Sequence, residues 1–310
     1  MDNSSSQKSE TKQKVNEIRT FPVPFALGEK KENITISTNT LSKLSKEQII
    51  NQAIQFHLKG NIPEATKYYQ QLINGGCVDY RVFSNYGAIL IGLGKLKEAE
   101  LSTRKAIELK PDLAEAHANL GSILKDLSRL QEAEISFRKA IKIKTDFAGA
   151  YYNLGIILSD LGKSQDALDS YLKVIKINPS FSNIYPTITG LIKDADPSKF
   201  NKSKLKYIIN LLLERDDLHH KGLIRVFHFL YRNELIINLE KFDSDFSDIG
   251  FFLNNKVVIN ALKKISFCDV KLEELLTKVR RNICERISKN IETVNSSALQ
   301  FIIALGEQCF

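Results

Sequence analysis

The pattern of small, apolar and polar positions repeats every 34 residues between residues 80 and 181. Each unit predicts two antiparallel helices, because it lacks the sustained two-residue alternation of a strand. A period of this length is typical of a solenoid, in which each unit packs only on its neighbours. The positions that share the spacing are Asn85, Asn119 and Asn153; Gly87, Gly121 and Gly155; and Ala99, Ala133 and Ala167.

The repeated small residues predict how the two helices of a unit meet. The glycine and alanine columns allow the first helix to approach the second closely. A second glycine column, represented by Gly60, Gly94 and Gly162, falls between the two helices, where a positive φ suits glycine. Ser128 stands in that column in one unit. Aromatic residues at a further column are expected to fill the gap between successive units: Tyr69, Phe137 and Tyr171.

A weaker copy of the unit precedes the three clear ones. Ala53 and Ala65 occupy its small-residue columns, and Pro111 and Pro179 close two of the later units because proline cannot continue a helix. We therefore expect four repeats in residues 44–181, with the boundaries 46–79, 80–113, 114–147 and 148–181.

These columns resemble the tetratricopeptide repeat (TPR). The third unit carries Leu120, Gly121, Ala133 and Phe137 of the family pattern, and the fourth carries Leu154, Gly155, Ala167, Tyr171 and Pro179. Thr103 and Thr145 depart from it at the aromatic and proline positions, and the tryptophan position holds Ile49, Phe83, His117 and Tyr151. The resemblance implies an all-α fold, a right-handed TPR superhelix, whose first helices line a concave groove.

The flanking regions have a different pattern. Residues 1–43 are rich in Ser, Lys, Glu and Gln and predict a mostly disordered tail. Within it, Phe21-Pro22-Val23-Pro24-Phe25 predicts an extended segment, since prolines oppose a helix. Packing of its phenylalanines on the protein's own first helices is favoured over recognition by a partner. Residues 182–310 predict a non-repeat, all-α region; one apolar stripe at helical spacing comprises Leu272, Leu275, Leu276, Val279, Ile283 and Ile287.

Composition and charge narrow the class of function. The net charge of +8 is spread as +2, +3 and +3 over residues 1–43, 44–181 and 182–310, so no basic stripe indicates nucleic acid as a partner. No apolar run approaches the roughly 20 residues of a membrane helix, which argues against a membrane partner. The four cysteines, Cys77, Cys268, Cys284 and Cys309, are far apart and are expected to be buried free thiols in a reducing cytoplasm.

No residues form a recognisable catalytic, cofactor or metal motif. The Gly92-Leu93-Gly94 stretch follows a predicted helix rather than a strand, so it does not indicate a nucleotide loop. None of the five histidines has the spacing of a zinc site. Arg104-Lys105 and Arg138-Lys139 on the second helices are expected to be solvated surface. The sequence predicts a protein that is not an enzyme and needs no cofactor.

The candidate binding site is a column of four asparagines on the first helices: Asn51, Asn85, Asn119 and Asn153. A carboxamide both donates and accepts hydrogen bonds, so a row of them suits the backbone of an extended peptide. The row resembles the asparagine ladder in the TPR superhelix of O-linked N-acetylglucosamine transferase. A column can also be inherited by duplication of the repeat without serving any function. We expect the column to face solvent.

Two functions follow from these patterns. The first is a non-enzymatic TPR scaffold that binds a protein or extended peptide in its groove, with its oligomeric state left open. The second follows from a further resemblance, carried by residues 20–29 and 272–281, to bacterial TPR proteins with a downstream methyltransferase-like domain. That resemblance implies the recognition half of a split or truncated methyltransferase, or less plausibly of a glycosyltransferase. These 310 residues contain no glycine-rich S-adenosylmethionine loop.

Overall fold

The part of the chain that the structure describes consists of helices joined by short connections. A computed structural model describes residues 45–241, 255–265, 269–288 and 302–305, and this part of the chain contains no strand. The expectations for the tail 1–43, for Cys268 and for Cys309 lie outside these residues. The chain divides into two compact units, Met1–Ser182 and Asn183–Phe310, which are described separately below.

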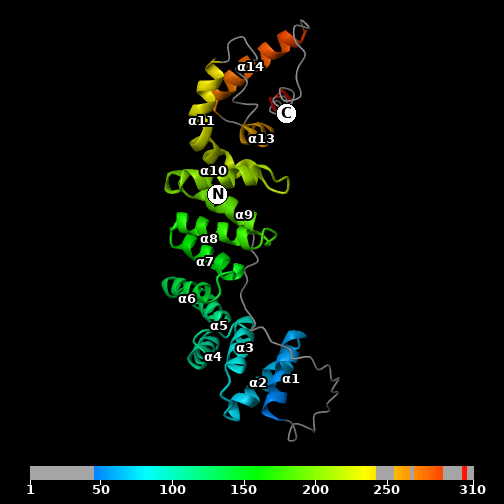
Figure 1. Cartoon of the computed structure of the whole chain (residues 1–310), viewed down its shortest axis with the longest axis vertical. Coiled ribbons are helices and arrows are strands. Elements are labelled where there is room, and N and C mark those ends of the chain that lie inside the picture. The colour runs from blue at the N-terminus through cyan, green and yellow to red at the C-terminus, as the bar shows by residue number, and fades with distance from the viewer. Residues whose placement is uncertain (1–44, 242–254, 266–268, 289–301, 306–310) are drawn as a thin grey trace, which may run out of the picture. The chain divides into compact units, whose positions relative to one another are not determined.

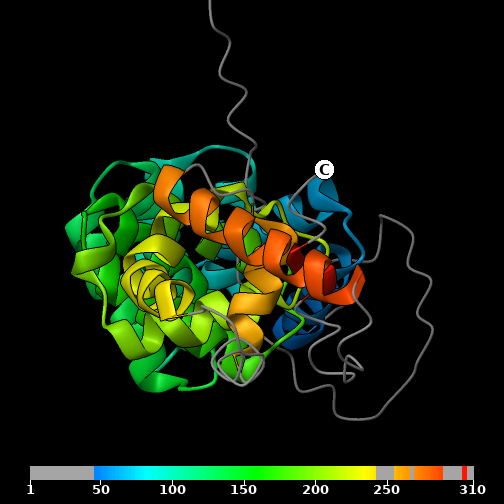
Figure 2. The same ribbon diagram turned by 90° about the horizontal axis from the view of Figure 1, so that it is seen from above.

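The first unit is a succession of antiparallel helix pairs, which Figures 1 and 2 show from two directions. The first helices begin at Lys46, Tyr80, Ala114 and Ala148, which preserves the 34-residue period of the sequence. Each first helix packs mainly on the second helix that follows it. In order, the helices are α1 (Lys46–Leu58), α2 (Ile62–Asn74), α3 (Tyr80–Gly92), α4 (Leu96–Leu109), α5 (Ala114–Asp126), α6 (Leu130–Ile143), α7 (Ala148–Asp160) and α8 (Ser164–Ile177).

The glycine column of the first helices is where the two helices of a repeat come closest. A methyl group added to Gly121 would lie 2.8 Å from ring carbons of Phe137, and one added to Gly155 would collide with the Tyr171 ring. The predicted close approach is confirmed. The rings of Phe137 and Tyr171 cover the glycine of their own repeat; that they also fill the gap between successive repeats stays a prediction.

The turn between the two helices of a repeat requires a left-handed residue. Gly60, Gly94 and Gly162 have φ values of 74°, 72° and 73°, as the sequence predicts. Ser128 occupies the same position in the third repeat with φ of 60°. A residue with a Cβ atom is strained in this region by about 1–2 kcal/mol, so the third repeat is less stable at this turn than its neighbours.

We expect the substitution Ser128→Gly to stabilise the protein. Relief of strain outweighs the greater flexibility of glycine in the unfolded chain, leaving a net gain of about 0.5–1 kcal/mol. The free energy of unfolding, measured by urea denaturation, checks this. The reciprocal change Gly94→Ser is the matched control and should destabilise. An unchanged or lower stability for Ser128→Gly would contradict the account.

A second prediction concerns the helix contact. Gly121→Ala should destabilise by about 1 kcal/mol or more, because overpacking against Phe137 exceeds the gain in helix propensity. Gly92→Ala is the matched control, since Gly92 is also in a first helix and no atom lies within 4 Å of its added methyl group. Thermal unfolding of the two variants should shift in opposite directions. A shift of the same sign and size in both would show that the close approach is unimportant.

The second unit packs helices of unequal length, from 9 residues in α13 to 19 in α14, around its own apolar core. Leu272, Leu276, Val279 and Ile283 of the predicted apolar stripe are buried and face the core, as do Leu223, Phe227 and Leu235. An ion pair of 2.5 Å between Arg232 and Asp269 joins two of the helices. The helices are α9 (Ile184–Asp194), α10 (Lys202–Leu213), α11 (Ile224–Lys241), α13 (Lys256–Lys264) and α14 (Val270–Ser288), with short 3₁₀ turns at Pro197–Lys199 and His220–Leu223.

Two features bear on the expected compartment. Cys77 and Cys284 are free thiols, but only Cys77 is buried, so the expectation of burial is wrong for Cys284. Cys284 lies on α14 beside the buried Ile283, and the helical turn carries its side chain to the surface. None of the helices in the described ranges combines the length and the hydropathy that crossing a bilayer requires.

Candidate functional site: the inner surface of the repeats

The first helices of successive repeats lie against one another. Contacts join α1 to α3, α3 to α5 and α5 to α7, whereas successive second helices approach each other less closely. A stack whose first helices are the closer set curves with those helices on its inside. We call the side of α1, α3, α5 and α7 that points away from the second helices the inner surface.

Helix geometry directs the asparagine column toward this surface. Each asparagine precedes the residue of the glycine column by two positions, and Gly87, Gly121 and Gly155 point at their own second helices. Two residues correspond to a rotation of about 200° around the helix axis. The asparagine side chains therefore leave the first helices on the side opposite the second helices. Their positions are Asn51 on α1, Asn85 on α3, Asn119 on α5 and Asn153 on α7.

The column is covered, contrary to the expectation that it faces solvent. Asn85, Asn119 and Asn153 are 3%, 0% and 3% exposed, and only Asn51 is partly exposed. Each of the three covered residues has an interaction partner. A carboxamide removed from water must find such partners, because an unpaired buried amide is costly. Sequence periodicity gives the direction of a side chain but not what covers it, so this burial was not predictable.

Some buried polar groups of the first helices have unused hydrogen-bonding capacity. The hydroxyl oxygens of Ser84 and Ser122 and the Oδ1 atom of Asn51 are buried, and the described residues offer them no hydrogen-bond partner. Ser84 adjoins Asn85, and Ser122 lies almost one helical turn beyond Asn119. Leaving such a group unsatisfied costs about 1–3 kcal/mol. Of these three groups, only Asn51 belongs to the asparagine column, because Ser84 and Ser122 lie about 60° and 100° around the helix from the glycines that face the second helices.

Charges beside the asparagine column are paired within the protein. Glu47, Arg81 and Glu115 each lie one helical turn before an asparagine of the column. Arg81 contacts Glu47 at 2.7 Å and Asp79 at 2.7 Å, while Glu115 contacts Lys144 at 3.5 Å. The hydrogen bonds from Arg81 hold the pKa of Glu47 below its usual value. These charged groups are therefore already paired within the protein, and a charged ligand would have to compete with the existing ion pairs.

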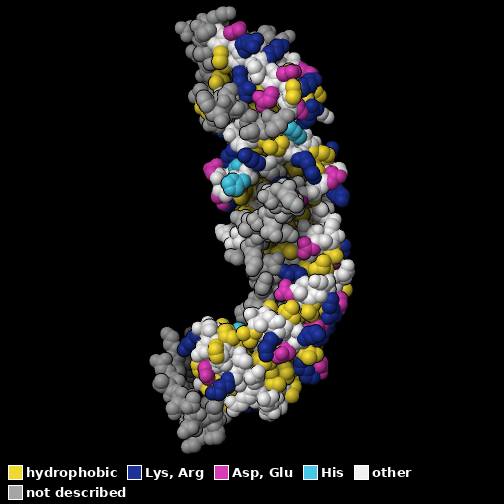
Figure 3. All heavy atoms as spheres, turned by 180° about the vertical axis from the view of Figure 1, so that it is seen from behind, with side chains coloured by type: hydrophobic (Ala, Val, Ile, Leu, Met, Phe, Trp, Pro, Cys, Tyr) yellow, Lys and Arg dark blue, Asp and Glu magenta, His cyan; other side chains and the backbone are white. Residues whose placement is uncertain are grey.

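Basic and acidic side chains also alternate elsewhere in the protein. On the face drawn in Figure 3 they lie interspersed and do not gather by sign.

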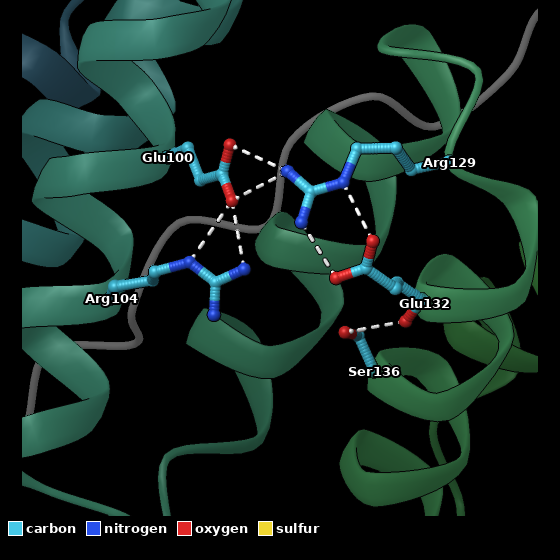
Figure 4. Close-up of polar contacts among 5 residues, drawn as sticks. All are labelled: Glu100, Arg104, Arg129, Glu132 and Ser136. Atoms are coloured by element: carbon cyan, nitrogen blue, oxygen red, sulfur yellow. Dashed lines mark hydrogen bonds and ion pairs between the residues drawn. The ribbon is translucent and has the colours of Figure 1, made fainter.

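A network of ion pairs joins successive repeats on the side of the second helices. Arg129, at the start of α6, reaches Glu100 of α4 at 2.9 Å and Glu132 at 2.6 Å, and Arg104 also binds Glu100 (Figure 4). Burial raises the pKa of Glu100, but hydrogen bonds from Arg104 and Arg129 outweigh it and hold that pKa below its usual value. Ser136 donates to the backbone carbonyl of Glu132 at 2.9 Å.

The same network recurs one repeat later. Glu134 binds Arg138 at 2.9 Å and Lys163 at 2.8 Å, each residue lying 34 positions after its counterpart. Arg104 and Arg138 are about half exposed, as expected for surface residues, yet each pairs with a largely buried glutamate. We assign these residues to the joints between repeats. Sequence analysis missed them because the partners are 29 residues apart and belong to different helices.

A second concavity lies among α4, α5 and α6. It has a volume of about 400 Å³ and is lined by apolar Leu120 and Ile135 together with His117, and by Arg104 and Glu132 of the ion-pair network. His117 is 6% exposed, and its Nε2 atom lies 2.9 Å from the carbonyl oxygen of Pro111. The described part of the chain has no group of three or more His, Cys, Asp or Glu residues arranged around a metal position.

The burial of His117 predicts a dependence of stability on pH. Burial lowers the pKa of His117 and the charge of Lys139 lowers it further, while the hydrogen bond to Pro111 opposes them. His117 therefore binds a proton more readily in the unfolded chain than in the folded protein. Its contribution to the free energy of unfolding is fully present above the usual pKa of about 6.5 and is lost as the pH falls below that value. Burial also lowers the pKa of His57, so the stability contributed by His57 depends on pH with the same sign.

When the pH is lowered from 7.5 to 5, we expect the free energy of unfolding to decrease less in His117→Phe than in the wild type. Phe83 and Tyr151 occupy the corresponding position in the neighbouring repeats, so an aromatic ring fits the column. Urea denaturation at both pH values gives the two differences. His219→Phe serves as the control because His219 lies outside the repeats. Identical pH dependence in wild type and His117→Phe would contradict the assignment.

Comparison with known proteins identifies the repeats. Family models described as tetratricopeptide repeat match residues 80–113, 114–147 and 148–181. Residues 80–181 are tetratricopeptide repeats. The resemblance that the sequence columns indicated is thereby confirmed for this part of the chain. A search of curated proteins gave no match.

Several solved structures share helical architecture with the chain. A crystal structure of MamA is 25% identical, with a TM-score of 0.45, and the match covers 52% of this chain and 92% of MamA. YrrB, described as a TPR protein with an unusual peptide-binding site, is 16% identical over 58% of this chain and 90% of its own, with a TM-score of 0.48. PilF of Pseudomonas aeruginosa is 13% identical over 75% and 97%, with a TM-score of 0.47.

Proposed function

We propose that this protein is a non-catalytic scaffold whose inner TPR surface binds an extended segment of a partner protein. The observation that carries the proposal is the asparagine column. Four carboxamides occur at the same position of four successive first helices, directed away from the second helices. The proposed partner is a protein or peptide rather than nucleic acid or membrane. The free thiols of Cys77 and Cys284 are compatible with a reducing cytoplasm.

The spacing of the column suits a peptide backbone. Helices in contact lie about 8–10 Å apart, and successive first helices are in contact. An extended chain advances about 3.3 Å per residue, so neighbouring carboxamides meet the backbone at about every third residue. Each carboxamide can accept from a backbone N–H and donate to a backbone carbonyl. Such a site recognises extended conformation more than any particular side chain.

The electrostatics favour a ligand segment without charge. Because Arg81 is neutralised by Glu47 and Asp79, and Glu115 by Lys144, a charged ligand side chain would have to compete with existing ion pairs. Apolar and small side chains avoid that competition. We therefore assign an uncharged, extended segment to the inner surface.

The sequence resemblance to proteins with a downstream methyltransferase-like domain leads to a different function, the recognition half of a split enzyme. No feature of the described residues favours that function over simple peptide binding. It remains a prediction from residues 20–29 and 272–281.

The central test removes two carboxamides. Binding of a peptide selected from a displayed random library against the full chain should weaken by about tenfold or more in Asn85→Ala/Asn119→Ala, because each lost hydrogen bond is worth about 0.5–1.5 kcal/mol. Affinity is measured by calorimetry well below the unfolding temperature, since these buried residues also contribute to stability. Asn74→Ala is the matched control, because Asn74 is exposed at the end of α2.

The ligand provides an independent control. Methylation of single backbone nitrogens of the selected peptide should weaken binding at about every third position and have little effect between them. A double variant that binds as tightly as the wild type would show that the column is an inherited feature of the repeat. A uniform response along the peptide would contradict the proposed register.

A further inference from the structure

We propose that the uncharged segment 20–28 of this same chain occupies the inner surface in cis and competes there with partner peptides. This inference rests on the proposed function, since it assigns an internal regulator to the same site. The segment reads Thr-Phe-Pro-Val-Pro-Phe-Ala-Leu-Gly and is bounded by Arg19 and Glu29. It lies outside the described residues, and the argument depends on its sequence and on the groups of the inner surface.

The inner surface is already engaged within the single chain. Asn85, Asn119 and Asn153 are at most 3% exposed, and each has an interaction partner. An incoming peptide therefore cannot simply add to open carboxamides; it has to displace whatever contacts them. A binding site that is covered in the free protein is the arrangement expected when an internal segment competes with the external ligand.

The chemistry of the segment matches that of the surface. Pro22 and Pro24 fix φ near the value of an extended chain and prevent a helix, so little conformational entropy is lost when the segment binds in that form. The prolines also lack an N–H, which leaves their carbonyl oxygens as acceptors for the carboxamide N–H groups of the asparagine column. The nine residues carry no charge, as the paired charges around Arg81 and Glu115 require.

The segment is long enough to reach the column. The described chain begins at Ser45, so the chain from Phe25 to Ser45 advances by 20 residues. These residues span up to about 66–72 Å when extended. Passing from α1 to α7 along the contacting first helices crosses three steps of about 8–10 Å, or about 24–30 Å. Tethering of this kind gives a local concentration on the order of millimolar, so even a weak internal ligand occupies the site.

A tryptophan reporter tests the proposal directly, because the chain contains no tryptophan. In full-length Phe25→Trp, we expect emission shifted to shorter wavelength and protected from acrylamide quenching, relative to a synthetic peptide of residues 15–35 with the same substitution. Adding Asn85→Ala/Asn119→Ala should move both readings toward those of the free peptide. Adding Asn74→Ala should leave them unchanged.

Competition between segment 20–28 and the library-selected peptide can be measured in a second way. Full-length Phe21→Ser/Phe25→Ser should bind the library-selected peptide roughly tenfold more tightly than the wild type, since apparent affinity rises with the fraction of vacant sites. This variant keeps every residue of the inner surface intact. It also remains informative if the asparagine variants fail to fold.

Specific outcomes would overturn the proposal. Emission of Phe25→Trp identical to that of the free peptide would do so, as would unchanged affinity in Phe21→Ser/Phe25→Ser. A blue shift that disappears on dilution, together with a change in molecular mass by light scattering, would mean that a second copy supplies the segment. If the selected peptide still depends on Asn85 and Asn119 in these cases, the proposed function stands and only the internal competition fails.

Discussion

The close contact between the two helices of each repeat determines the rest of residues 80–181. Gly121 leaves no room for a methyl group beside Phe137, and the same holds for Gly155 beside Tyr171. Such contact fixes not only the distance between the helices but also the rotation of the first helix about its axis. Since interiors are packed to a density that resists small changes, a single added carbon affects the whole pair.

That rotation is what connects packing to function. With the glycines directed at the second helices, the residue two positions earlier must leave the opposite side of the first helix. The 34-residue period then repeats this direction from α3 to α5 to α7, so Asn85, Asn119 and Asn153 fall into register without any contact among distant parts of the chain. The ion pairs of Glu100 and Glu134 with basic residues 29 positions later add a second tie between neighbouring repeats.

The sequence predicts what depends on local rules and misses what depends on neighbours in space. The helix starts, the glycine contacts and the left-handed turns at Gly94 and Gly162 follow from periodicity and backbone sterics. The burial of Asn119 does not, because the sequence does not reveal what packs on a helix face. The exposure of Cys284 and the concavity around His117 likewise depend on the angles at which helices meet.

Side-chain amide signals of the asparagines provide the most direct test of peptide binding on the inner surface. Addition of a library-selected peptide to the nitrogen-15-labelled full chain should move the carboxamide resonances of Asn85, Asn119 and Asn153 with one common dissociation constant, while Asn74 stays in place. Saturable binding of the peptide with these three resonances unmoved would contradict the account and direct attention to another surface, such as the concavity among α4, α5 and α6.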